Sequence, residues 1–141
     1  MRHLQYFLVA SVVGIGAAVT APAADFKIIA NESVGATSVS AEELKGVFLS
    51  TKTSLSDGSH VVPVLEKGGP AHEAFLKEYL GKNESALETY YRSLVFNGKA
   101  QMPKTLGADA EVVAYVAKTK GAIAYVAADA ATDGVKTLET K

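Results

Sequence analysis

Lys120-Gly-Ala-Ile-Ala-Tyr-Val126 is the stretch of sequence that says most about the architecture. A run with apolar residues at helical spacing, from Glu111 to Thr119, ends at this Lys-Gly pair, and a short, uninterrupted apolar run follows directly. Glycine is typical just after a helix, because it adopts a left-handed backbone conformation without steric cost. A continuous apolar run of this length, over residues 122–127, predicts a buried strand. A helix that leads at once into a buried strand is typical of α/β proteins.

Two segments upstream of this unit also predict buried strands. Phe26-Lys-Ile-Ile-Ala30 is a short apolar run, and residues 60–65 form another, in which Pro63 favours an edge position or a strand end. A short last strand is expected over residues 135–138, after the Asp133-Gly134 turn. We therefore expect a small, mixed sheet of three or four strands.

Helices are expected between these strands. Four segments carry apolar residues at helical spacing: residues 41–49, 71–80, 85–96, and the segment that runs from a capping Asp109 to Gly121. The clearest start signal is Ser40-Ala-Glu-Glu43, a capping box in which each end residue bonds the backbone amide of the other. Residues 31–39 and 99–108 are expected to be loops. The alternation predicts an α/β domain, with a small mixed sheet flanked by helices.

The first 23 residues predict a secretory signal peptide. Arg2 gives a short basic start, an apolar run follows from Leu4 to Val19, and Ala21-Pro-Ala23 offers small residues to a signal peptidase. This run of about 16 residues is short for a ~30 Å hydrocarbon core, so a membrane anchor is the less favoured alternative. We expect a signal peptide over residues 1–23, a domain over residues 24–141, and a periplasmic location.

Composition narrows the classes of function. The 141 residues include 14 Lys and Arg against 15 Asp and Glu, and no Cys. A chain of this length has room for one domain with one core. The balanced charge, with no basic run, speaks against nucleic acid as a partner, because binding to a phosphate backbone needs clustered Lys and Arg. Without cysteine the chain can form neither a disulfide nor a thiolate metal site.

Four short motifs occur along the chain in an informative order: Val47-Phe-Leu-Ser50, Pro63-Val64, Gly68-Gly69 and Thr119-Lys-Gly-Ala-Ile-Ala-Tyr-Val126. Together they resemble the second lobe of bacterial periplasmic phosphate-binding proteins of ABC transporters. The resemblance extends over residues 26–138, and it implies a single lobe of the type II periplasmic-binding-protein-like fold. It also implies a non-enzymatic, solute-binding-like protein that binds phosphate or a similar oxyanion for ABC transport.

The turn that would hold the ligand departs from the family pattern. The family places a serine, glycine, threonine-type triplet at a helix start, where this chain has Lys67-Gly-Gly-Pro-Ala-His72, without hydroxyl side chains and with one amide hydrogen lost to proline. The helix start still offers free amides and a partial positive charge, which favour an anion. With the planar guanidinium of Arg92 added, the candidate ligand-binding residues are Lys67, Gly68, Gly69, Ala71, His72 and Arg92.

Plainer interpretations of the same residues stay open. The glycine pair can be a tight turn that only starts a helix, His72 can be a surface residue, and Arg92 can pair with Glu88 four positions before it. His60 and His72 do not have the spacing of a common zinc site, and the chain has no Cys to complete one. We expect no metal, no cofactor and no enzymatic site, because no nucleophile has a matching base.

Two functions from different classes follow from this pattern. Two-lobed binding proteins close around a ligand at a hinge, so a single lobe would need a second wall. A second copy, as a homodimer, or a periplasmic or membrane protein partner could supply that wall. The alternative function is a periplasmic interaction module that has kept the fold and lost ligand binding, which the missing hydroxyl groups of the turn favour.

Overall fold

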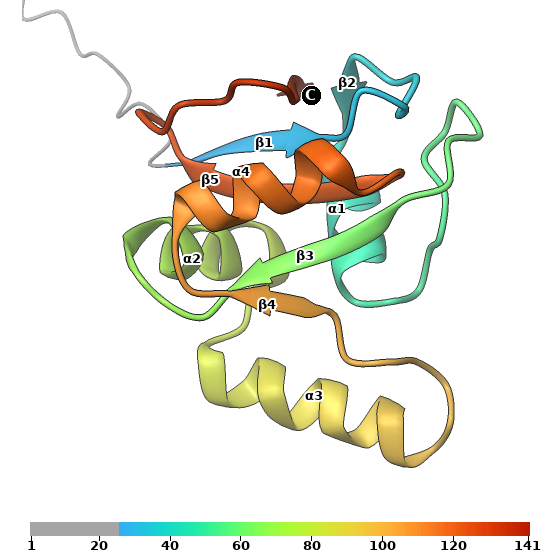
Figure 1. Cartoon of the computed structure of the whole chain (residues 1–141). Helices are drawn as coiled ribbons and strands as arrows, with labels where there is room; N and C mark the ends of the chain where they lie inside the picture. Colours follow the sequence, from blue (N-terminus) through green and yellow to red (C-terminus); the bar gives the residue numbers. More distant parts are fainter. Residues whose placement is uncertain (1–25) are drawn as a thin grey trace, which may run out of the picture.

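A computed structural model describes residues 26–141 (Figure 1), and the signal peptide predicted over residues 1–23 lies outside the described residues. The strands are β1 (Phe26–Ala30), β2 (Ser38–Val39), β3 (Val62–Glu66), β4 (Lys104–Leu106), β5 (Ala122–Ala127) and β6 (Lys136–Thr140). The helices are α1 (Ala41–Phe48), α2 (Pro70–Phe75), the π-helix η1 (Leu76–Leu80), α3 (Glu84–Phe96) and α4 (Asp109–Lys118). The expected α/β architecture is thus confirmed.

All the described strands belong to one mixed sheet, in the order β2-β6-β1-β5-β3-β4. Strand β1 is antiparallel to both of its neighbours, whereas β3 is parallel to β5 and to β4. The expected count of three or four strands was wrong, because β2 and β4 lie in segments predicted to be loops. These two strands have two and three residues, too few for a strand pattern to be visible in the sequence.

The position of Pro63 fits the way in which β3 pairs with its neighbours. It lies within β3, which is an inner strand and not the edge strand that was one of the two expectations. Strand β4 pairs only with residues 64–66 of β3, so Pro63 lies before the point where that ladder begins. A proline without an amide hydrogen is therefore tolerated there.

Helices cover both faces of the sheet, and each face has its own apolar core. Alternate residues of β5 define the two sides: Ile123 and Tyr125 pack with α1, α2 and η1, whereas Ala122, Ala124 and Val126 pack with α4. Because β5 is buried on both faces, its sequence is continuously apolar rather than alternating. Figure 1 shows α4 across the sheet and α3 beyond β4, away from the centre of the sheet.

The predicted capping box fixes the start of α1. The Glu43 amide donates to Ser40 Oγ at 3.1 Å, and Glu43 Oε2 accepts from the Ser40 amide at 2.8 Å. Glu43 Oε1 accepts in addition from the amide of Ser56 at 2.7 Å. These bonds to the charged carboxylate, that to the Ser40 amide foremost, lower the pKa of Glu43 to about 2. A side chain that looked only local in sequence therefore also ties the following loop to the helix.

Two of the predicted helices differ in detail from the expectation. The segment predicted as one helix over residues 71–80 changes from α-helix to π-helix at Leu76, and Gly81 ends it with a left-handed φ of 62°. Asp109 is the first residue of α4 and not its cap, and Oδ1 of its side chain accepts from the amide of Ala127 at 3.4 Å. Within residues 26–141, no helix has the length and apolarity needed to cross a membrane.

Candidate functional site

The turn between β3 and α2 is a tight turn that starts a helix, as the glycine pair before Pro70 predicts. The amide of Lys67 donates to the carbonyl oxygen of Leu106 at 2.9 Å, which fixes the turn to β4. Gly69 then takes φ 95° and ψ 171°, a conformation that only glycine adopts readily, and Pro70 opens the helix. The second glycine of the pair is thus needed for the change of direction at the helix start.

Several backbone amides at this turn are unbonded. Among the hydrogen bonds of residues 26–141, none has the amide of Gly68, Gly69, Ala71 or His72 as its donor, and the first helical bond runs from the Glu73 amide to Gly69 at 3.0 Å. A Cβ atom added at Gly68 or Gly69 would meet no atom within 4 Å, so the turn is open. Unbonded amides at a helix start are donors that favour an anion. Gly68 and Gly69 are exposed, whereas Ala71 and His72 are buried.

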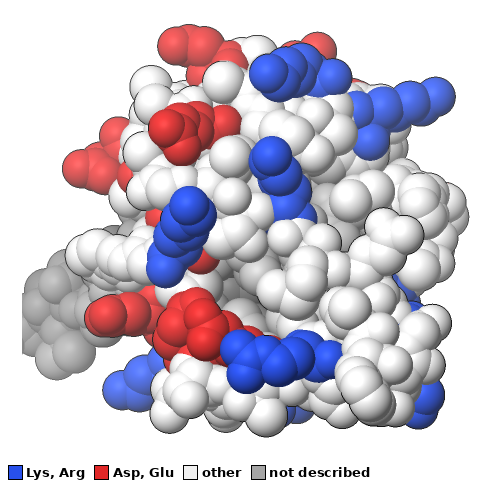
Figure 2. All heavy atoms as spheres, turned by 60° about the horizontal axis from the view of Figure 1, so that its bottom comes forward, with Lys and Arg blue, Asp and Glu red and all other residues white. Residues whose placement is uncertain are grey.

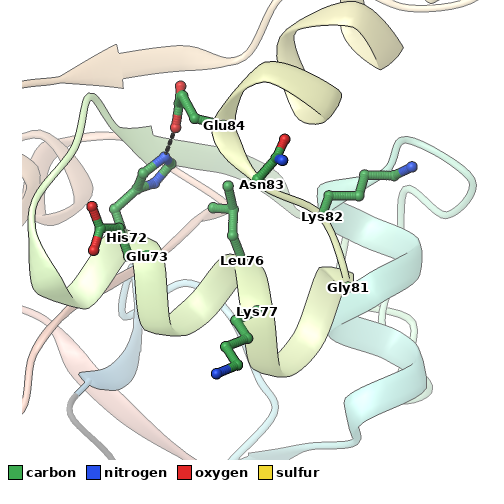
Figure 3. Close-up of a pocket in the computed structure, with 8 residues that line it drawn as sticks. All are labelled: His72, Glu73, Leu76, Lys77, Gly81, Lys82, Asn83 and Glu84. Atoms are coloured by element: carbon green, nitrogen blue, oxygen red, sulfur yellow. Dashed lines mark hydrogen bonds and ion pairs between the residues drawn. The ribbon is translucent and has the colours of Figure 1, made fainter.

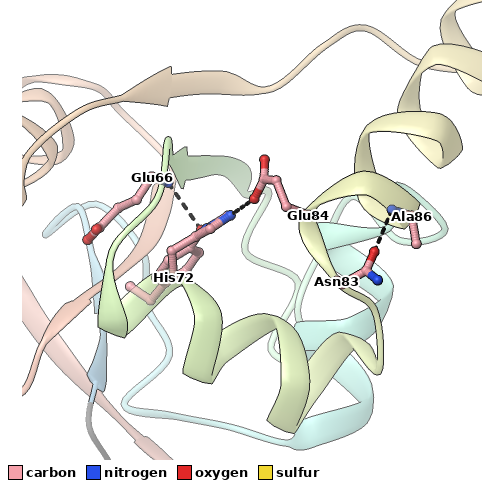
Figure 4. A network of polar contacts seen from close by, with 6 residues as sticks. Glu66, His72, Asn83, Glu84 and Ala86 are labelled. Carbon is pink, nitrogen blue, oxygen red and sulfur yellow. Dashed lines mark hydrogen bonds and ion pairs between the residues drawn. The ribbon is translucent and has the colours of Figure 1, made fainter.

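The side chain of His72 is buried, and the expectation of a surface residue was wrong. It is 2% exposed, and Nδ1 lies against the hydroxyl of Tyr125. Nε2 lies against a carboxylate oxygen of Glu84 (Figure 4). His72 faces the sheet because it lies one helical turn before Phe75 and Leu76, which are both buried in the apolar core on that face. Both ring nitrogens are engaged within the protein, so the side chain offers no free nitrogen to a ligand, while the backbone amide of His72 has no hydrogen-bond partner among the described residues.

One assignment of protons satisfies every hydrogen bond in the series that runs from Glu66 through Tyr125 and His72 to Glu84, here called the polar chain. The amide of Glu66 donates to the oxygen of the Tyr125 hydroxyl at 3.1 Å. Burial raises the pKa of Tyr125, so the hydroxyl keeps its proton and can donate it to Nδ1 of His72. The neutral ring then donates from Nε2 to Glu84. The chain links β3, β5, α2 and the start of α3, and it thereby sets the position of the turn relative to α3.

Glu66 is a buried acid that the sequence analysis did not single out. Its side chain is 5% exposed, and Figure 4 shows it pointing away from His72 and Glu84. Its Oε1 atom has no hydrogen-bond partner among residues 26–141. Burial first, and then the neighbouring Asp109 carboxylate, raise the pKa of Glu66 to about 8. The only signal in the sequence was an acid in the last position of an otherwise apolar strand.

Two hollows flank the contact between His72 and Glu84. The larger, of about 540 Å³, is formed by α2, η1 and the start of α3 (Figure 3); it is lined by His72, Glu73, Leu76, Lys77, Gly81, Lys82, Asn83 and Glu84. The second, of about 380 Å³, adjoins the turn and includes Lys67, Met102 and Thr105. The structure thus brings Lys67 and His72 to one hollow, at opposite ends of the glycine turn.

Arg92 lies apart from the other candidate residues. It lines a third hollow on α3, which shares only Glu88 and Met102 with the hollow beside Lys67. The alternative ion pair with Glu88 is not formed, since within residues 26–141 no lysine or arginine lies within ion-pair distance of a carboxylate. No group of three or more metal-binding side chains occurs in this part of the chain. Basic and acidic side chains are interspersed on the face shown in Figure 2.

Comparisons with known proteins identify relatives by fold alone. No family model matches the sequence, and no curated protein matches it. Among solved structures, a phosphate ABC transporter substrate-binding protein from Clostridium perfringens, with bound phosphate, matches with a TM-score of 0.61 and 15% identity over 82% of this chain. An ABC-type phosphate transport receptor from Vibrio cholerae matches with a TM-score of 0.54 and 13% identity over 82%. PstS from Borrelia burgdorferi matches with a TM-score of 0.54 and 10% identity over 83%.

The lengths of these proteins matter for the interpretation. The matched region covers 44% of the Clostridium chain, 46% of the Vibrio chain and 47% of the Borrelia chain. This chain therefore spans about half the length of the solved structures it matches. The resemblance predicted from the sequence is confirmed at the level of fold: this chain is similar in architecture to about half of a phosphate ABC transporter substrate-binding protein.

Proposed function

We propose that this protein is a non-enzymatic, periplasmic solute-binding-like protein that binds phosphate or a similar oxyanion for ABC transport. The observation that carries the proposal is the open turn at Gly68 and Gly69, where four backbone amides have no partner within the described chain. The fold of the phosphate-binding neighbours supports it. The signal peptide predicted over residues 1–23 supports the periplasmic location.

The candidate residues have separate roles in this proposal. The amides of Gly68, Gly69, Ala71 and His72 donate to the oxyanion, which also lies at the positive end of the helix dipole. The exposed ammonium group of Lys67 adds charge at the same turn. Arg92 acts from the adjoining hollow on α3, at the outer margin of the site. The His72 ring holds the turn in place through Tyr125 and Glu84 and does not itself bind the ligand.

A single lobe offers the oxyanion only one wall. Small-ligand sites generally enclose most of the ligand surface, and the hollows beside this turn are open. The second wall is therefore supplied by another protein surface: a second copy of this chain, or a periplasmic or membrane protein that works in the transport system. Affinity then depends on this assembly as well as on the turn.

One set of observations favours a second function, that of a periplasmic interaction module. The turn has no hydroxyl side chain, and Pro70 contributes no amide. The carboxylate of Glu73 in the first turn of α2 would repel an anion. Under this alternative the turn only starts a helix, and the surface of the domain docks on a partner protein.

Calorimetric titration with phosphate separates the two functions. The sample is the chain of residues 24–141, which contains every described element, at low salt, with sulfate as the competing oxyanion. The proposal predicts saturable binding that Gly68→Asp weakens at least tenfold, because a carboxylate is placed beside the unbonded amides. Gly68→Asn is the matched control, since it adds the same shape without charge to a position with no atom within 4 Å. No heat at millimolar phosphate, with the protein folded, would favour the interaction module.

A further inference from the structure

An exposed apolar patch lies at the end of α3, next to the glycine turn described above and sharing the marginal residue Arg92 with its site. Its members are Glu88, Arg92, Val95, Phe96 and Met102, which together line a hollow of about 430 Å³ and are called the α3 patch below. Phe96 is 90% exposed, Met102 57% and Val95 43%. They are three of the four large apolar side chains that are exposed within residues 26–141. Contiguous apolar surface of this kind commonly marks a protein interaction site.

The exposed side chains at the end of α3 are not needed to hold this helix on the domain. Only Leu87 and Tyr91 of the helix are buried. The Tyr91 hydroxyl donates to the carbonyl oxygen of Phe48, and the Tyr90 hydroxyl donates to that of Leu49 at 2.6 Å, so α3 is fixed to the end of α1. The apolar core is complete without Phe96. The helix thus presents the α3 patch from a fixed position, as a preformed interface requires.

The shape and charge of the α3 patch indicate what covers it. It combines an exposed ring, Phe96, with a hollow that this ring helps to line. It also carries one acid and one base, Glu88 and Arg92, which are four residues apart on the helix and form no ion pair with each other. A surface with one exposed ring, one hollow and one charge of each sign is complementary to itself. A strongly charged partner, such as nucleic acid or an anionic membrane surface, would meet no excess of the opposite charge on this patch.

We propose that the α3 patch is a self-association surface and that its occupant is a second copy of this chain, related by a two-fold axis. In such an interface each patch meets its own equivalent, so Phe96 of one protomer enters the hollow of its partner. Glu88 of each protomer faces the partner's Arg92, and the two ion pairs form at the rim of the buried rings. The planar guanidinium of Arg92 can also lie over the partner's Phe96.

The proposal does not depend on the oxyanion site, although the two surfaces adjoin. Glu88 and Met102 of the α3 patch also line the hollow beside Lys67. A second copy docked there would therefore border the glycine turn. Self-association measured without phosphate tests the interface alone, so a failure of this proposal can be told apart from a failure of phosphate binding.

Sedimentation velocity over a wide range of chain concentration tests the interface. A patch of five residues predicts a dimer with a roughly micromolar to submillimolar dissociation constant, because small interfaces associate weakly. Phe96→Ser should raise the dissociation constant at least tenfold and leave thermal unfolding unchanged, since the ring is outside the core. Val62→Ser is the matched control: Val62 is another exposed large apolar residue, outside the patch, and its variant should dimerise normally.

Charge exchange tests the two-fold arrangement. Glu88→Arg alone and Arg92→Glu alone should each be monomeric, because like charges then face each other across the axis. An equimolar mixture of these two variants should form heterodimers, since every position 88 then faces an opposite charge at position 92. Dimers should also return in the E88R/R92E double variant. A monomeric wild-type chain, a dimer that survives Phe96→Ser, open-ended polymers, or failure of the mixture to associate would each overturn the proposal.

Discussion

The hydroxyl of Tyr125 on β5 lies against Nδ1 of His72 on α2, although 53 residues separate the two in sequence. The two rings are stacked, with centroids 5.8 Å apart. The same hydroxyl accepts from the amide of Glu66, the last residue before the glycine turn. One phenol therefore satisfies groups on both sides of the turn, and it couples the sheet to the helix start where the oxyanion is proposed to bind.

Removal of this hydroxyl should destabilise the protein. Tyr125→Phe leaves the Glu66 amide and the His72 nitrogen buried without a partner, and unsatisfied buried groups cost about 1–3 kcal/mol. Urea unfolding of the variant measures this loss. Tyr115→Phe is the control, because the Tyr115 side chain is half-buried and its hydroxyl has no hydrogen bond within the described chain. Equal stability of the two variants would show that the polar chain contributes nothing.

Glu66 should make the protein less stable as the pH rises. Its pKa is about 8 in the folded protein and 4.5 ordinarily, so between these values the folded state binds more protons than the unfolded state. The free energy of unfolding should fall across this window, by at most about 1.4 kcal/mol per pH unit from this group. Glu66→Gln keeps the shape without the titration. Urea unfolding from pH 5 to about 8 should therefore give a flatter profile for this variant; identical profiles would exclude Glu66 as the source.

Glu43 should act in the opposite direction and at lower pH. Its pKa is lowered from 4.5 to about 2, so its stabilising effect is complete above pH 4.5 and is lost as the pH falls toward 2. Glu43→Gln should destabilise the protein at pH 7 by about 1–3 kcal/mol, because bonds to a charged acceptor are replaced by bonds to a neutral one. The difference between variant and wild type should shrink in acid. A constant difference from pH 7 to about 2 would contradict the assignment.

Gly121 should tolerate no side chain. Its φ is 77°, and an added Cβ would lie 2.9 Å from the carbonyl oxygen of His60. Gly121→Ala should cost at least about 1–3 kcal/mol from the backbone conformation, with the clash in addition. Gly68→Ala is the matched control, where the added atom meets nothing and the expected change is within about 0.5 kcal/mol. Thermal unfolding of both variants makes the comparison, and a stable Gly121→Ala would contradict the close approach.

The sequence was most informative where structure is set locally. The capping box at Ser40, the apolar run over residues 122–127 and the glycine after the last helix, Gly121, each depend on neighbours in the chain, and each was predicted. The edge strands β2 and β4 were missed because two and three residues are too few to show a strand pattern, and only their distant pairing partners define them. The π-helical turn of η1 likewise has no signal in residue spacing.

The site could be predicted only in part, for the same reason. The turn at Gly68 and Gly69 was visible as a glycine pair before a proline, and its role as a helix start is confirmed. The contacts of the buried His72 ring are with Tyr125 and Glu84. The pKa of Glu66 is raised by burial first and then by Asp109. All of these partners are distant in sequence. Arg92 was grouped with the turn by its chemistry, and in the fold it lines a hollow on α3 that adjoins the hollow beside Lys67.

The most direct test of the central claim is a phosphate titration followed by amide chemical shifts in ¹⁵N-labelled protein of residues 24–141. The account predicts saturable shifts at the amides of Gly68, Gly69, Ala71 and His72, because these are the unbonded donors at the helix start. Amides on α4 should stay unchanged. Millimolar phosphate that leaves these four signals in place, or that shifts only signals elsewhere in the domain, would contradict oxyanion binding at this turn.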